Sequence, residues 1–83
     1  KSDCILIDLR EDSEIKNKPS INNSLNIPYS KLQEYLKINK GFLEGKKIIF
    51  YCAVGQRSTL AIQICLSYKI NKIFHLIGGI NNL

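Results

Sequence analysis

The chain has 83 residues, of which 45% are hydrophobic and 23% are charged, and its formal net charge at pH 7 is +5. This length accommodates a single domain, residues 1–83, and the composition argues against a disordered chain and against a disulfide scaffold. The longest apolar runs fall far short of the roughly 20 residues that cross a membrane. We therefore expect no membrane span, no signal peptide and no membrane partner.

The first third of the chain predicts a strand, a short helical turn and a loop. The apolar run Cys4–Leu9 is rich in β-branched residues and predicts a strand. Residues Glu11–Lys16 are expected to form one helical turn. The segment Asn17–Asn26 contains Pro19 and several Asn and Ser residues, and this composition is typical of a loop.

A helix is predicted after this loop. Ser30 is suited to cap its first turn, because a hydroxyl can accept a hydrogen bond from a backbone N–H group that has no partner there. Three apolar residues then recur at helical spacing: Leu32, Tyr35 and Leu36. We expect the helix to end where Gly41 and Gly45 break this pattern.

The second half predicts a strand, a helix and a strand. The strands are Lys47–Cys52 and Lys72–Ile77, and the helix covers Ser58–Tyr68. The helix has an apolar stripe of Leu60, Ile64 and Tyr68, with Ala61 and Cys65 beside it. The strands are apolar throughout, which is typical of strands buried on both faces of a parallel sheet. The sequence therefore predicts the α/β class, with a central parallel sheet flanked by helices.

The loop after the second predicted strand, from Cys52 to Ser58, contains the candidate catalytic residues. In open α/β sheets, ligands bind beyond the carboxyl ends of the strands, which is where Cys52 stands. N–H groups that precede a helix have no partner within it, and together with the helix dipole they form a cradle for an anion. Because such a setting lowers the pKa of a thiol, Cys52 is the predicted nucleophile and leaving group.

Residues near Cys52 support this interpretation over an inert core thiol. Gly55 permits a backbone turn that a Cβ atom would obstruct, and Arg57 adds a permanent cation that could hold the loop or contact an anionic substrate. Ser58 is suited to cap the following helix. At the end of the first strand, Asp8 and Arg10 are expected to form an ion pair at the rim of the site.

The residues of this loop resemble the rhodanese (thiosulfate sulfurtransferase-like) family, whose active-site loop has the form C-x-x-G-x-R-S. Here that loop is Cys52-Ala53-Val54-Gly55-Gln56-Arg57-Ser58. Three further segments resemble the family's D-x-R-E, N-I-P and L-x-G-G-I patterns in the same order: Ile7-Asp8-Leu9-Arg10-Glu11, Asn26-Ile27-Pro28 and Leu76-Ile77-Gly78-Gly79-Ile80. The resemblance covers nearly the whole chain.

The resemblance implies a sulfurtransferase. Cys52 would accept a sulfane sulfur as a persulfide from thiosulfate or another persulfide and pass it to a thiophilic acceptor. The residues that would bind the substrate are Ala53, Val54, Gly55, Gln56, Arg57 and Ser58. No metal and no organic cofactor is implied.

The chain also departs from the family pattern. Many members have G-H-I-x-G before N-I-P, but this chain has Pro19-Ser20-Ile21-Asn22-Asn23, and we expect Asn23 to take the left-handed conformation of a glycine. Leu83 stands where many members have Trp. The family's first strand and helix and its last helix have no counterpart here, which predicts a domain without the typical terminal elements.

Two other functions remain open. The first is a docking module of the same fold without catalysis, although the presence of Cys52, Gly55 and Arg57 argues for activity. The second is a cysteine-dependent phosphatase or arsenate reductase. These enzymes need C-x5-R around a phosphoryl group, whereas Cys52 to Arg57 is C-x4-R, and the shorter loop favours sulfur.

The remaining cysteines and the charge give expectations about the surroundings of the protein. The three cysteines lack C-x-x-C spacing and the chain has a single His, so we expect no metal site. An odd number of cysteines predicts free thiols in an intracellular reducing compartment, most simply the cytoplasm. Cys4 and Cys65 are expected to pack as small apolar residues, and His75 to be a satisfied strand residue. The scattered lysines are typical of a solvated surface, so a nucleic acid is not the expected partner.

The chain contains no Met, which indicates a segment of a longer polypeptide. One hypothesis is a domain fused to an adenylyltransferase that thiolates a sulfur-carrier protein, since a charge of +5 would suit an acidic carrier.

Overall fold

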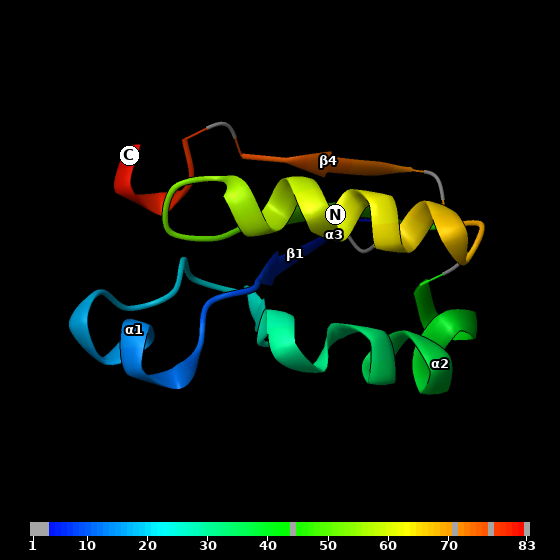
Figure 1. Cartoon of the computed structure of the whole chain (residues 1–83), viewed down its shortest axis with the longest axis horizontal. Helices are drawn as coiled ribbons and strands as arrows, with labels where there is room; N and C mark the ends of the chain where they lie inside the picture. The colour runs from blue at the N-terminus through cyan, green and yellow to red at the C-terminus, as the bar shows by residue number, and fades with distance from the viewer. Residues whose placement is uncertain (1–3, 44, 71, 77, 83) are drawn as a thin grey trace.

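A single parallel sheet organises the chain. The computed structural model describes residues 4–43, 45–70, 72–76 and 78–82 (Figure 1). The strands are β1 (Cys4–Asp8), β2 (Leu25–Asn26), β3 (Lys47–Tyr51) and β4 (Ile73–His75). They lie in the order β2-β1-β3-β4, and every neighbouring pair is parallel. The predicted α/β class with a parallel sheet is confirmed.

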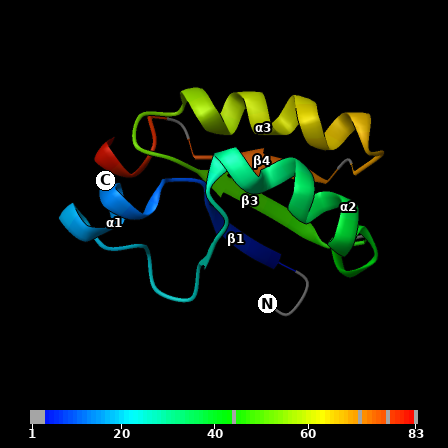
Figure 2. The same ribbon diagram turned by 60° about the horizontal axis from the view of Figure 1, so that its bottom comes forward.

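Helical segments connect the strands and follow β4: α1 (Asp12–Asn17), the 3-10 turn η1 (Tyr29–Lys31), α2 (Leu32–Leu43), α3 (Gln56–Ser67) and the 3-10 turn η2 (Ile80–Asn82). Helices α2 and α3 lie side by side on one face of the sheet (Figures 1 and 2). Helix α1, the loop after β3 and η2 gather at the carboxyl ends of the strands, on the left in Figure 1. This edge is where the sequence predicts a site.

The two faces of the sheet differ in their cover. A row of residues in register packs toward α2 and α3: Ile5, Ile48 and Ile73. The neighbouring row points to the opposite face: Leu6, Ile49 and Phe74. The prediction that the strands are buried on both faces is wrong for β4, because Phe74 is 54% exposed. The reason is that α2 and α3 both pack against the first face.

Several predicted boundaries also differ from the structure. The segment predicted to be only a loop contains β2, and Asn23 in that segment has the expected left-handed conformation, with φ of 68°. Ser30 lies within η1 and donates its hydroxyl to Glu11 instead of capping a helix. Helix α2 runs through Gly41 to Leu43, with a local departure from helical geometry at Asn39.

Helix α3 buries only part of the apolar stripe that its sequence predicts. Ile64 and Tyr68 of the stripe are partly buried and pack against the core. The buried residues of the helix are Ser58, Ala61 and Cys65, whereas Leu60 is 47% exposed. Small side chains allow the helix axis to lie close to the sheet, and this packing outweighs the burial of one leucine. The predicted short helix after β1 is confirmed as α1.

The third predicted strand is shorter than expected at both ends, and Ile77 lies outside the described residues, as does Leu83. Among the described residues, no helix is long and apolar enough to cross a membrane.

The turn after β4 is fastened to the loop after β3. The N–H group of Ile80 donates to the carbonyl oxygen of Cys52 over 2.8 Å, and that of Asn81 donates to the carbonyl oxygen of Ala53 over 3.0 Å. Gly79 makes this approach possible. Its φ of 69° lies in the left-handed region, and a Cβ atom there would overlap the carbonyl groups of Cys52 and Ala53.

We therefore expect Gly79→Ala to lower the free energy of unfolding by at least about 2 kcal/mol, because the new methyl group adds both backbone strain and overlap. Gly41→Ala is the matched control. A Cβ atom at Gly41 meets nothing within 4 Å, so alanine in this helical position should raise the free energy of unfolding by about 0.5–1 kcal/mol. Urea denaturation of both variants measures the difference, and equal effects would contradict the close approach of the two segments.

Candidate active site

Cys52 is the residue around which this edge of the sheet is arranged. It directly follows β3, near the middle of the sheet, and only 1% of its surface is exposed. Its Sγ atom accepts a hydrogen bond from the backbone N–H group of Gly55 over 3.1 Å. Cys52 thus belongs to the buried core, and its thiol contacts the loop that follows it.

Gly55 turns the chain from this loop into α3. It is the N-cap residue of α3 and has a φ of 103°, so the predicted glycine turn is confirmed. The hydroxyl groups of Ser58 and Thr59 both donate to the Gly55 carbonyl oxygen, over 3.1 and 2.9 Å. Ser58 is thus not the helix cap that its position suggested, because α3 begins at Gln56, two residues before Ser58.

The peptide groups of the loop are oriented by the turn that packs against them. The carbonyl oxygens of Cys52 and Ala53 accept hydrogen bonds from the turn after β4. In a trans peptide, the N–H group points opposite to the carbonyl group, so the N–H groups of Ala53 and Val54 point away from that turn. With the Gly55 N–H group on Sγ and the first N–H groups of α3, the loop presents consecutive donors, which is the arrangement of an anion-binding nest.

This environment changes the acidity of Cys52. Burial acts to raise the pKa of its thiol, but the backbone N–H groups of Ser58, Gly55 and Arg57 and the Ser58 hydroxyl outweigh burial, and the pKa lies below its ordinary value. The prediction of an easily ionised thiol agrees with this direction. A thiolate at this position is both the reactive form of cysteine and a good leaving group.

The other two cysteines differ from Cys52 and from each other. Cys65 is buried in α3, as predicted, and burial raises the pKa of its thiol to about 11. Cys4 is exposed at the start of β1, so the prediction that it packs in the core is wrong. Its side chain points to the face of the sheet that α2 and α3 leave uncovered.

Arg57 is held by a carboxylate that the sequence did not indicate. Its guanidinium group donates to both carboxylate oxygens of Glu14 in α1, each over 2.7 Å. This bidentate pair lowers the pKa of Glu14 to about 2 and is half-buried. Glu14 also accepts a hydrogen bond from the backbone N–H group of Glu11, which fixes the carboxylate in the first turn of α1.

Asp8 and Arg10 form the predicted ion pair, but the pair lies below the surface and not at the rim of the site. The side chains are 0% and 2% exposed, and the Arg10 guanidinium lies 2.9 Å from the Asp8 carboxylate. Burial alone would raise the pKa of Asp8, but hydrogen bonds from Arg10 and Ser20 lower it below its usual value. The amide of Asn26 binds the carbonyl oxygens of both residues, so the pair joins the ends of β1 and β2.

His75 lies closer to the site than its place in a strand suggested. In the parallel register it is opposite Phe50, on the face that α3 covers, and its Nδ1 atom lies 3.3 Å from the Ser58 hydroxyl. Either atom can be the donor. His75 therefore has a polar partner, as predicted, and this partner also contacts the Cys52 loop.

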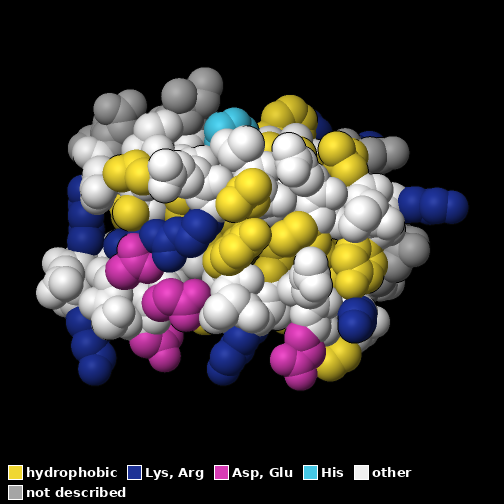
Figure 3. Space-filling view, viewed as in Figure 1, with side chains coloured by type: hydrophobic (Ala, Val, Ile, Leu, Met, Phe, Trp, Pro, Cys, Tyr) yellow, Lys and Arg dark blue, Asp and Glu magenta, His cyan; other side chains and the backbone are white. Residues whose placement is uncertain are grey.

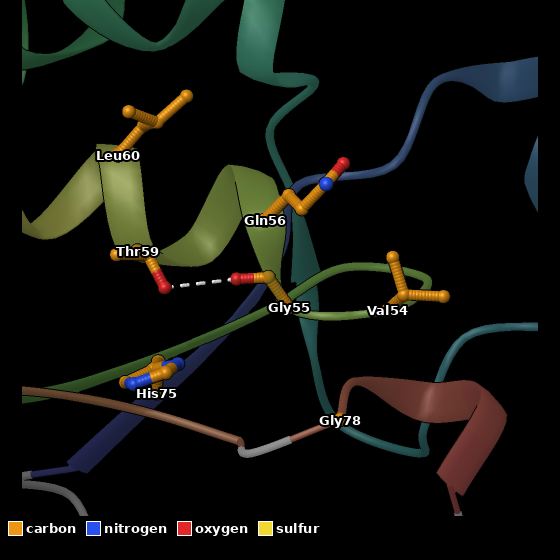
Figure 4. A pocket seen from close by; sticks show the side chains of 7 residues that line it. All are labelled: Val54, Gly55, Gln56, Thr59, Leu60, His75 and Gly78. Carbon is orange, nitrogen blue, oxygen red and sulfur yellow. Dashed lines mark hydrogen bonds between the residues drawn. The ribbon is translucent and has the colours of Figure 1, made fainter.

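A pocket of about 630 Å³ opens between this part of β4 and the start of α3 (Figure 4). The residues that line it are Val54, Gly55, Gln56, Thr59, Leu60, His75 and Gly78. Val54 is 58% exposed and Gln56 is also exposed, so these two predicted substrate-binding residues lie at the surface, while Ala53 is half-buried. The pocket and Cys52 share the Gly55 turn as a common wall.

The surface around α3 has a distinct character. On the face shown in Figure 3, hydrophobic side chains gather over α3, and acidic ones gather at the end of the molecule where α1 lies. Across residues 4–43, 45–70, 72–76 and 78–82, no three His, Cys, Asp or Glu residues gather in a way that could hold a metal ion.

Comparisons with known proteins agree with this geometry. The sequence model of the family described as "Rhodanese-like domain" matches residues 1–83. A Rickettsia rickettsii (strain Sheila Smith) protein named tRNA uridine(34) hydroxylase is 32% identical over 83 residues, covering 96% of this chain and 33% of that protein. The Mus musculus protein named thiosulfate sulfurtransferase/rhodanese-like domain-containing protein 3 is 31% identical, covering 93% of this chain and 55% of that protein.

A solved structure is also similar. It belongs to a protein of unknown function from Rhodopseudomonas palustris, described as a possible tyrosine phosphatase. It has a TM-score of 0.88 and 29% identity and covers 98% of this chain and 65% of that one. The chain thus spans about a third of the Rickettsia relative and about half of the mouse relative.

The site predicts a specific effect of Ser58 on the acidity of Cys52. In a Cys4→Ser, Cys65→Ala background, the single remaining thiol should ionise below the usual pH range of cysteine, as followed by the ultraviolet absorbance of the thiolate. Ser58→Ala removes a hydroxyl group that helps to lower the pKa of the Cys52 thiol, so this variant should raise that pKa. Thr59→Ala is the matched control, because the Thr59 hydroxyl donates to the same Gly55 carbonyl oxygen but is not among the groups that lower the pKa of Cys52. If Ser58→Ala has the same thiolate titration curve as the parent protein, the role of Ser58 in lowering the pKa of Cys52 is contradicted.

Proposed function

Because the chain belongs to the rhodanese-like domain family, we propose that it transfers sulfane sulfur through a persulfide formed on Cys52. The observation that supports this most directly is the hydrogen bond from the Gly55 N–H group to Sγ, within a loop whose peptide groups lower the pKa of that thiol. A persulfide adds one sulfur atom beyond Sγ. It carries its negative charge on that terminal atom, which the loop donors can then stabilise.

In the loading step, the Cys52 thiolate attacks the outer sulfur atom of the donor. A bond forms between Sγ and that sulfur, and the sulfur–sulfur bond of the donor breaks. With thiosulfate, the electron pair leaves with sulfite, and the charge moves to the new terminal sulfur. No separate general base is required, because the nucleophile is already ionised.

In the discharge step, a thiophilic acceptor attacks the terminal sulfur. Cyanide, for example, forms a carbon–sulfur bond and leaves as thiocyanate, while the electron pair of the sulfur–sulfur bond returns to Sγ. The main contribution of the protein is the fixed set of N–H donors, which need no reorganisation as charge moves between the two sulfur atoms. The products are the free Cys52 thiolate and the sulfurated acceptor.

The names of the similar proteins include other activities. The hydroxylase named above is about three times as long as the segment that it shares with this chain, so its named activity belongs to a protein of which this chain matches only a third. The phosphatase description belongs to the Rhodopseudomonas protein. In this chain, the guanidinium of Arg57 is held by Glu14 and would first have to leave that carboxylate to bind a phosphoryl group.

Intact-protein mass spectrometry after incubation with a sulfur donor tests the proposal. The wild-type protein should gain the mass of one sulfur atom, and cyanide should remove it with release of thiocyanate. Cys52→Ser should lose this adduct completely while remaining folded, because a hydroxyl has nearly the same shape as a thiol but stays un-ionised at neutral pH.

Cys4→Ser serves as the control, since Cys4 is the exposed thiol, and it should behave as the wild type does. Thiosulfate and an organic persulfide are both used as donors, and p-nitrophenyl phosphate is added in a separate reaction. Failure of both donors to load Cys52, or hydrolysis of the phosphate ester that depends on Cys52, would overturn the proposal.

A further inference from the structure

The pocket beside the Cys52 loop is placed to hold the group that carries the transferred sulfur. Gly55 forms its wall on one side and donates its N–H group to Sγ on the other. Figure 4 shows Val54 and Gly55 on the loop side of the pocket, with Gln56, Thr59 and Leu60 on α3. Its volume of about 630 Å³ is in the range of pockets that bind organic molecules and far exceeds what the five atoms of thiosulfate fill.

The lining of the pocket is uncharged and largely apolar. Val54 and Leu60, which are 58% and 47% exposed, both line it. The described polar residues of the lining are Gln56, Thr59 and His75, which can form hydrogen bonds, and none of the described lining residues is Lys, Arg, Asp or Glu. Such a surface favours the carbon portion of a ligand and gives a sulfonate no cation to pair with.

Three cations at this edge of the sheet already have partners. Arg57 is bound through two hydrogen bonds of 2.7 Å to Glu14, so the pair has no net charge. Arg10 is buried against Asp8. Lys18 donates its ammonium group to the carbonyl oxygen of Ile80, in the turn that packs against the loop. A dianion such as thiosulfate would have to compete with these partners.

We propose that this pocket binds the uncharged carbon portion of an organic persulfide, and that Cys52 is loaded from such a donor in preference to thiosulfate. The inference rests on the proposed function and names its donor class. In the step, the Cys52 thiolate bonds to the outer sulfur of R–S–S–H, and the sulfur–sulfur bond of the donor breaks. The electron pair leaves with the R–S group, which takes up the proton of the donor and departs as a thiol.

Two probes of similar size and reactivity test the charge preference. They are the persulfide of N-acetylcysteine methyl ester, whose carbon portion is neutral, and the persulfide of N-acetylcysteine, which carries a carboxylate. Mass spectrometry measures the rate of Cys52 loading from each probe. The ratio of the ester rate to the acid rate is then divided by the same ratio measured with free cysteine in place of the protein, which corrects for the intrinsic reactivity of the probes. We expect the corrected ratio to favour the ester by roughly tenfold, since the pocket offers the carboxylate no charged partner.

A matched pair of variants ties the preference to the pocket. Leu60→Lys places a cation in the lining, whereas Leu66→Lys adds the same charge on the same helix at a residue that is 52% exposed and outside the lining. Leu60→Lys should lower loading from the ester and raise loading from thiosulfate, and Leu66→Lys should change neither. Glu14→Gln should also raise loading from thiosulfate, because it releases Arg57 from its partner.

The outcomes separate this inference from the function on which it rests. If Cys52 is loaded but the corrected ratio is near one, or if Leu60→Lys and Leu66→Lys have equal effects, the donor preference is wrong and the sulfurtransferase proposal stands. If Glu14→Gln lowers loading from every donor to the same extent, Glu14 only supports the loop and its role in donor choice is wrong. If no donor loads Cys52, the sulfurtransferase proposal itself is overturned.

Discussion

Two backbone hydrogen bonds set the orientation on which the site depends. The N–H groups of Ile80 and Asn81 hold the carbonyl oxygens of Cys52 and Ala53, and the peptide groups between Cys52 and Val54 are thereby fixed with their N–H groups on the opposite side. If these carbonyl groups turned toward Sγ instead, the same loop would repel a thiolate. Gly79 is required for this arrangement because its backbone lies against both carbonyl groups. Gly79, which has no side chain, thus determines the electrostatic environment of the reactive Cys52 side chain.

Charged side chains at this edge of the sheet mainly pair with one another. Asp8 receives hydrogen bonds from the Arg10 side chain, the Arg10 backbone and Ser20, which together offset the cost of burying its charge. Across residues 4–43, 45–70, 72–76 and 78–82, every buried side-chain nitrogen or oxygen atom has a hydrogen-bond partner. The field at Cys52 therefore comes chiefly from fixed peptide dipoles. These dipoles depend less on salt and pH than free side-chain charges would.

The sequence predicts well what is local and poorly what is distant along the chain. The three longer strands are visible as apolar runs, and the turn at Gly55 follows from residues next to Cys52. Strand β2 has only two residues and no apolar run, so it is defined by pairing with β1 alone. The partner of Arg57 lies 43 residues away, on a helix whose position depends on the assembled sheet. Nothing in the local pattern around Glu14 indicates that contact.

Helix α3 shows a different limit of sequence analysis. Hydrophobic periodicity gives most weight to large residues and so favoured the stripe through Leu60. In the structure, the fully buried residues of the helix are Ser58, Ala61 and Cys65, because close approach requires small side chains, while Ile64 of the stripe is only partly buried. The same geometry places Ser58 between Gly55 and His75, which makes a packing residue part of the polar surroundings of Cys52.

The depth of Cys52 also limits what this thiol can meet. A disulfide between two chains requires the backbones of both cysteines to approach within about 7 Å. With Cys52 only 1% exposed beneath its own loop, a second copy of the chain cannot bring its Cys52 that close while both remain folded. Two copies of the folded chain therefore cannot become linked through a disulfide at this residue. Oxidative dimerisation would begin instead at Cys4, the exposed thiol at the far end of the sheet.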